Sequence, residues 1–144
     1  VNPYGDYVME AELIPGSSQK APICFTARSS KDRAKLYGFY LYSTEQCIRL
    51  IETAPELKIK DLGKYGGAMR VGEPCRVKIS AVGEHLAMKL WPAEEGEPPE
   101  WQVEARDANL TEAGPIGIEI QRSGTPGGYA VEIRSLKVWT AETQ

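Results

Sequence analysis

Short segments in which apolar and polar residues alternate constrain the fold of this chain more than any other feature. Leu86, Met88 and Leu90 form one alternating set in residues 86–91, and residues 101–106 repeat the pattern. Alternation with a period of two predicts strands with one buried face. The prolines between the two segments cannot donate hydrogen bonds to a central ladder, so they confine the middle to a loop. The two segments are therefore predicted to form a hairpin.

The same pattern recurs along the whole chain, and no segment has a convincing helical period. The predicted strands cover residues 7–14, 23–28, 36–43, 46–53, 56–63, 77–81, 86–91, 101–106, 116–121 and 129–139. About ten strands at this spacing are typical of an all-β antiparallel sandwich or barrel. Two packed sheets are favoured over one open sheet, which would leave a face of apolar residues in contact with water.

Parity within the strands predicts where individual side chains point. In the last strand the apolar residues change parity, and a bulge near Arg134 and Ser135 would bring them back to one face. Trp101 has the core parity of its strand. Trp91 has the opposite parity. It either stands exposed, as a sugar platform or a contact for a neighbouring domain, or closes the end of the sandwich by packing on Pro92 and Pro98, and closure is favoured.

Composition limits the classes of function. The 144 residues fit one domain over 1–144, and the net charge of -3 does not suit a nucleic-acid partner. No apolar run approaches the roughly 20 residues of a membrane span. The sequence starts at Val1, which suggests a module of a longer polypeptide and makes a missing signal sequence uninformative.

The cysteines and the single histidine carry little chemistry. Cys24, Cys47 and Cys75 are an odd number, so they cannot all pair internally, and their spacing matches no zinc motif. They are interpreted as buried thiols, with a Cys24–Cys47 bridge as the alternative. His85, without a neighbouring serine or cysteine motif, does not indicate a nucleophile–base pair.

Several segments, in order, resemble the concanavalin A-like jelly-roll domains, in particular the laminin-G-like branch associated with sugar hydrolases in bacteria and phages. The residues that carry the resemblance are Gly5–Glu12, Ile23–Arg28, Leu36–Leu41, the Trp-Pro hairpin Lys89–Gln102, Gly114–Ile118 and Val131–Trp139. The hairpin is the most specific match. The resemblance implies a jelly-roll sandwich in an extracellular or virion-associated protein, next to other domains of a parent polypeptide.

The family often carries a structural calcium ion, but no other cofactor is implied here. Arg134 and Ser135 stand where many members have an Asp or Asn beside that ion. Asp6 and Asp107 flank strands and are the remaining candidate ligands, although no complete set of six to eight oxygens can be recognised.

The concave sheet face, which lies opposite the core, is predicted to hold the ligand site, with Arg28 and Tyr40 as the first candidates. The residues assigned to it are Arg28, Tyr40, Tyr42, Arg49, Glu119 and Gln121. Aromatic rings can stack on a sugar, while Arg, Glu and Gln can hydrogen-bond to hydroxyl groups. The alternative is that these side chains are ordinary polar neighbours paired across strands.

The predicted function is that of a non-catalytic module that binds a glycan. A structural or assembly module of a virion, as in a phage tail or decoration protein, is the second hypothesis. A glycoside hydrolase is the third, since it needs two suitably spaced carboxylates and the Glu-x-Asp-x-x-Glu pattern of catalytic relatives is missing.

Overall fold

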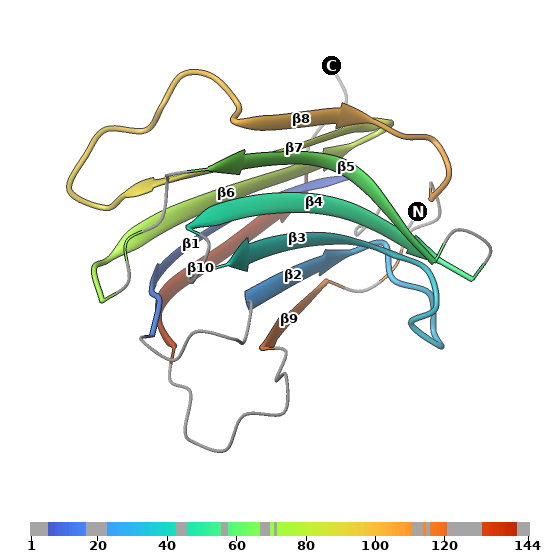
Figure 1. Cartoon of the computed structure of the whole chain (residues 1–144), viewed down its shortest axis with the longest axis horizontal. Helices are drawn as coiled ribbons and strands as arrows, with labels where there is room; N and C mark the ends of the chain where they lie inside the picture. Colours follow the sequence, from blue (N-terminus) through green and yellow to red (C-terminus); the bar gives the residue numbers. More distant parts are fainter. Residues whose placement is uncertain are drawn as a thin grey trace.

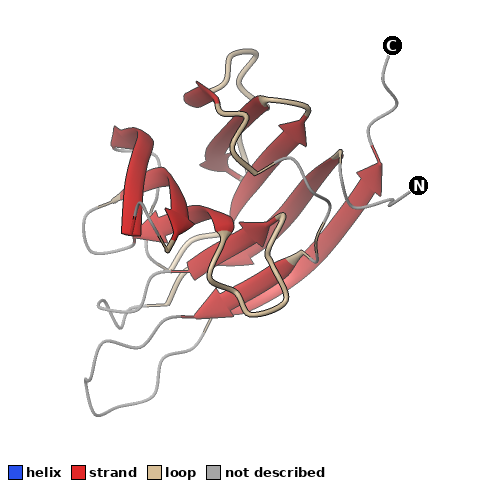
Figure 2. Cartoon of the chain, turned by 90° about the vertical axis from the view of Figure 1, so that its right-hand side faces the viewer, coloured by secondary structure: helices blue, strands red, loops and turns tan. Residues whose placement is uncertain are grey.

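The computed structural model describes residues 6–16, 23–42, 46–55, 58–66, 70, 72–110, 114, 116–120 and 131–140. Within these ranges all the regular secondary structure is β-strand (Figure 2), so the all-β prediction is confirmed. None of the described segments forms a helix long and apolar enough to cross a membrane.

Within the described residues, ten strands form two antiparallel sheets of five strands each. The strands are β1 (Tyr7–Ile14), β2 (Ile23–Ala27), β3 (Leu36–Tyr42), β4 (Cys47–Ala54), β5 (Lys58–Gly66), β6 (Cys75–Val82), β7 (His85–Pro92), β8 (Val103–Arg106), β9 (Gly117–Ile120) and β10 (Glu132–Thr140). Sheet A has the order β10-β1-β6-β7-β8, and sheet B has the order β5-β4-β3-β2-β9 (Figure 1). Two such sheets packed face to face make a sandwich.

The core lies between the sheets and follows the predicted parity. In β1, Tyr7, Met9, Ala11 and Leu13 are buried while the residues between them are partly exposed. The opposing layer is supplied by the odd-numbered residues of β2 and β3 and the even-numbered residues of β4. Each fully buried apolar side chain of this kind contributes about 1.5–3 kcal/mol to folding.

Strand β10 contains the predicted bulge. The register with β1 shifts between Glu12, which pairs with Ser135, and Leu13, which pairs with Ile133, so Arg134 is the extra residue. The inward-facing apolar residues of β10 thereby return to one face. The whole strand is nevertheless exposed, because β10 lies at an edge of sheet A.

Two predicted boundaries are wrong. The strand predicted over residues 56–63 ends too early, because β5 continues to Gly66. Strand β8 begins only at Val103, because Gln102 uses its side chain to bond both the amide nitrogen (2.8 Å) and the carbonyl oxygen (2.9 Å) of Leu90. The alternation through Trp101 therefore does not belong to a strand.

Candidate functional site

An aromatic pair lies on the outer face of sheet B, the face that points away from the core. The ring centroids of Tyr40 and Tyr42 are 5.6 Å apart, with an angle of 16° between the ring planes. The Tyr40 ring lies over Gly38, where a Cβ atom would stand 2.5 Å from its Cε2 atom. Glycine at position 38 thus allows the Tyr40 ring to lie close to the backbone, where it packs with Cys24 and Ile51.

Charged side chains flank this aromatic pair. Arg49, which pairs with Tyr40 across β3 and β4, donates two hydrogen bonds of 2.8 Å to the carboxylate of Asp61 on β5. These hydrogen bonds from Arg49 hold the pKa of Asp61 below its usual value. On the other side Glu119, which pairs with Cys24 across β2 and β9, forms an ion pair with Arg33.

The outer face of sheet B therefore brings together four of the six predicted site residues: Tyr40, Tyr42, Arg49 and Glu119. Tyr40 is only 8% exposed, whereas Tyr42, Arg49 and Glu119 are partly accessible. An aromatic surface with a guanidinium group on one side and a carboxylate on the other can stack on a sugar ring and hydrogen-bond to its hydroxyl groups. Gln121 lies outside the described residues.

Arg28 is placed elsewhere. Its side chain is 1% exposed and donates hydrogen bonds to the carbonyl oxygens of Gly83 (2.7 Å) and Leu110 (3.2 Å) and to the carboxylate of Asp6 (3.1 Å). The strand ends at Ala27, and Arg28 has a left-handed φ of 50°. The strand alternation that would place Arg28 on the outer face therefore ends at Ala27, one residue before Arg28.

A buried polar network continues from Arg28 across one end of the sandwich. The Tyr37 hydroxyl donates to the Asp107 carboxylate at 2.6 Å and accepts from the Leu110 amide at 3.1 Å. Lys60 lies 3.1 Å from the same carboxylate. Burial alone would raise the pKa of Asp107, but hydrogen bonds from Tyr37, the Asn109 amide and Lys60 together hold it below its usual value.

The two proposed calcium ligands do not fit a calcium site. Asp6 is bound to the Arg28 guanidinium and the Gly83 amide, and Asp107 to Tyr37 and Lys60. A protein cation thus already compensates each carboxylate. Within the described ranges, no three His, Cys, Asp or Glu side chains are grouped so that they could hold a metal ion.

The cysteines are buried and none forms a disulfide, which confirms the first interpretation and excludes the Cys24–Cys47 bridge. Burial raises the pKa of the Cys24 thiol to about 11 and that of Cys75 to about 12. The thiolate is the reactive form, so both groups are poor nucleophiles at neutral pH.

The tryptophans of the hairpin lie on the outer side of sheet A. Trp91 is 3% exposed and therefore not an open platform. The prediction that Trp101 lies in the core is wrong, because its ring centroid lies 5.0 Å from the ammonium group of Lys89, which points away from the core. Lys89 also pairs with Glu97 of the acidic loop at 2.9 Å. The loop and its tryptophan thus cover this part of sheet A.

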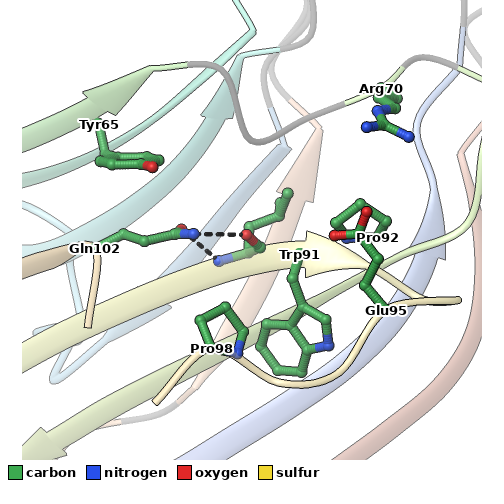
Figure 3. Close-up of a pocket in the computed structure, with 8 residues that line it drawn as sticks. Tyr65, Arg70, Trp91, Pro92, Glu95, Pro98 and Gln102 are labelled. Carbon is green, nitrogen blue, oxygen red and sulfur yellow. Dashed lines mark hydrogen bonds between the residues drawn. The ribbon is translucent and has the colours of Figure 1, made fainter. Parts of the chain in front are cut away.

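A cavity of about 200 Å³ lies where β5 passes the end of β7 (Figure 3). Its lining includes Tyr65, Arg70, Trp91, Glu95, Pro98 and Gln102. Sequence reasoning missed this cavity because Tyr65 and Arg70 lie beyond the strand predicted over residues 56–63. No local pattern marks it, since it depends on which strands face each other across the sandwich.

No protein-family model and no curated protein sequence matches the chain. Solved structures do match it. The carbohydrate-binding module CBM66 from Bacillus subtilis has a TM-score of 0.72 at 12% identity, over 94% of this chain and 75% of that chain. Galectin LEC-6 from Caenorhabditis elegans has a TM-score of 0.67 at 13% identity, over 96% of this chain and 86% of that chain.

A third match is to part of a longer protein. The GH43 protein BlXynB from Bacillus licheniformis has a TM-score of 0.68 at 15% identity, over 95% of this chain but only 28% of that chain. At these identities the likeness shows the fold, which is that of jelly-roll lectins and carbohydrate-binding modules.

Proposed function

We propose that the chain is a non-catalytic carbohydrate-binding module whose glycan lies on the outer face of sheet B. The observation that carries the proposal is the stacked Tyr40–Tyr42 pair between Arg49 and Glu119. The fold supports it, because similar structures include a carbohydrate-binding module and a galectin. The buried thiols with raised pKa values supply no evident nucleophile.

Each side chain has a distinct role in this proposal. Tyr42 offers its partly exposed ring to one face of a sugar, and the stacked ring of Tyr40 holds it in place. Arg49, fixed by Asp61, donates hydrogen bonds to hydroxyl groups, and Glu119 accepts them. Because Arg28 is enclosed by Gly83, Leu110 and Asp6, it would support the fold rather than touch the glycan.

Calorimetry with glycans selected from an array tests this proposal. Tyr42→Ala and Arg49→Ala should each weaken binding by about tenfold or more, because each removes a contact of roughly 1.4 kcal/mol or more. Arg76→Ala is the matched control, since Arg76 forms a similar exposed ion pair with Glu12 on the outer face of sheet A. Equal losses in all three variants, or turnover of aryl glycosides by the unmodified protein, would contradict the proposal.

The proposed function extends to where the module acts and to the polypeptide that carries it. A glycan-binding module would act outside the cell or on a virion surface, beside other domains of a parent polypeptide. The match to 28% of the longer BlXynB chain supports the module interpretation, because it puts the same fold within a larger protein. The full-length parent sequence would test it directly.

An assembly module is the second candidate function, and the exposed edge strand β10 favours it. Leu136 and Val138 face inward yet remain exposed, and Trp139 is exposed on the other face. A long apolar edge strand can pair with another chain. The solution mass measured by light scattering distinguishes the two candidates, because a stable oligomer without glycan binding would favour assembly by self-association.

A further inference from the structure

We propose that the cavity at the end of β7 is a second sugar site, which takes a single neutral sugar ring. It lies between β5, the end of β7 and the loop that follows β7, whereas the proposed glycan face is the outer side of sheet B. The two sites share no residue, so neither depends on the other.

The cavity exists because the two sheets end at different places. Strand β5 packs against β8, and at Gly63 a Cβ atom would stand 2.7 Å from the Cγ1 atom of Val103. Two residues further, Tyr65 has the inward parity of its partner Ile48. Strand β8 has not yet begun there, so β8 does not cover Tyr65, which is 43% exposed. An inward-facing aromatic ring at an open end is a stacking surface.

The remaining lining is suited to a polyhydroxylated ligand. In Figure 3, Tyr65 and Arg70 lie on one side of the end of β7, and Pro98 and the Trp91 ring lie on the other. The side-chain amide of Gln102 is engaged by Leu90, so Arg70 and Glu95 are the groups available for hydroxyls. Arg70 also forms an ion pair with Glu73 at 3.7 Å, so one cation stands beside two carboxylates. This balance favours a neutral sugar over an acidic or phosphorylated one.

The size of the cavity limits the ligand to one sugar unit. The cavity has a volume of about 200 Å³. This is smaller than the roughly 300–1,000 Å³ of pockets that enclose drug-sized ligands. A terminal sugar of a chain, or a free monosaccharide, therefore fits, and the rest of an oligosaccharide would have to extend into solvent.

The test uses the full chain and the methyl glycosides of glucose, galactose, mannose and fructose. Saturation-transfer NMR identifies a binder, and titration gives the Kd, expected at about 1 mM for a ligand of this size. Tyr65→Ala and Glu95→Gln should each weaken binding, the first by about tenfold or more. Ile59→Ala, at another exposed position of β5, is the matched control and should change nothing.

The outcomes separate the two sites. Binding that is weakened by Tyr65→Ala and Glu95→Gln but retained in Tyr42→Ala supports the cavity. If no methyl glycoside binds, or if Tyr65→Ala and Glu95→Gln leave the Kd unchanged, the cavity proposal is overturned. The glycan face on sheet B would still stand in that case, provided that Tyr42→Ala weakens binding of longer glycans.

Discussion

Arg28 and Arg49 make nearly the same bond in two regions of opposite character. Arg28 lies 3.1 Å from Asp6 and Arg49 lies 2.8 Å from Asp61. The Arg28 side chain is 1% exposed and also binds two backbone carbonyls, whereas that of Arg49 is 32% exposed on the outer face of sheet B. Burial, rather than residue type, therefore separates an arginine that stabilises the fold from an arginine that can contact a ligand.

The largest expected effect comes from Arg28→Ala. The substitution leaves Gly83, Leu110 and Asp6 without their buried donor, so the free energy of unfolding should fall by about 3–5 kcal/mol. Urea denaturation measures it. In the matched variant Arg49→Ala the loss should stay within about 1 kcal/mol, because exposed ion pairs contribute little. Equal falls in unfolding free energy for Arg28→Ala and Arg49→Ala would contradict the view that the first arginine stabilises the fold and the second does not.

Asp107→Asn should have the next largest effect, and that effect should depend on pH. The pKa of Asp107 lies below its unfolded value of about 3.9, so the carboxylate stabilises the fold above that pH and the contribution is lost as pH falls through the folded pKa. We expect the free energy of unfolding of the variant to be about 1–3 kcal/mol lower at pH 7, because the side chain that Tyr37 and Lys60 both bond is altered.

Unfolding free energies measured from pH 7 to about pH 3 check this prediction. The difference in unfolding free energy between the unmodified protein and Asp107→Asn should become smaller as pH falls. Asp61→Asn is the comparator on the exposed side, and its gap should be small at every pH. A gap for Asp107→Asn that stays constant with pH would show that its charge is not what stabilises the network.

Glu97→Gln should have the smallest effect. Glu97 pairs with the buried Lys89, but its own side chain is 40% exposed, so solvent screens the pair and the loss should stay below about 1 kcal/mol. Thermal unfolding at low and high salt measures it, and added salt should reduce the difference from the unmodified protein. A fall of several kcal/mol in the free energy of unfolding would contradict this and would mean that the acidic loop is a main source of stability.

The fold was predictable because strand alternation is a local signal. Tyr7 to Ile14 shows which face is buried without knowledge of any partner, and the change of parity around Arg134 marks the bulge. The prediction failed where the local rule stopped applying. Arg28 follows the end of β2 and has a left-handed φ, so it leaves the strand. Gln102 bonds the backbone of Leu90 through its side chain, so Trp101 lies before the start of β8 and outside the core.

The candidate site was predictable only in part for the same reason. Tyr40, Tyr42, Arg49 and Glu119 share a face because they lie on paired strands of known parity. The cavity beside Tyr65 depends on the overhang of β5 beyond the start of β8. That overhang is set by packing between the two sheets, which no single segment encodes.

Glycan binding by Tyr42→Ala, compared with Arg76→Ala, tests the central claim most directly. Both variants change positions on outer sheet faces, Tyr42 partly exposed and Arg76 exposed, and both should unfold at nearly the same temperature as the unmodified protein. With a glycan selected from an array, calorimetry should give a Kd at least about tenfold weaker for Tyr42→Ala and an unchanged Kd for Arg76→Ala. Undiminished binding by Tyr42→Ala would contradict the claim that the outer face of sheet B is the glycan site.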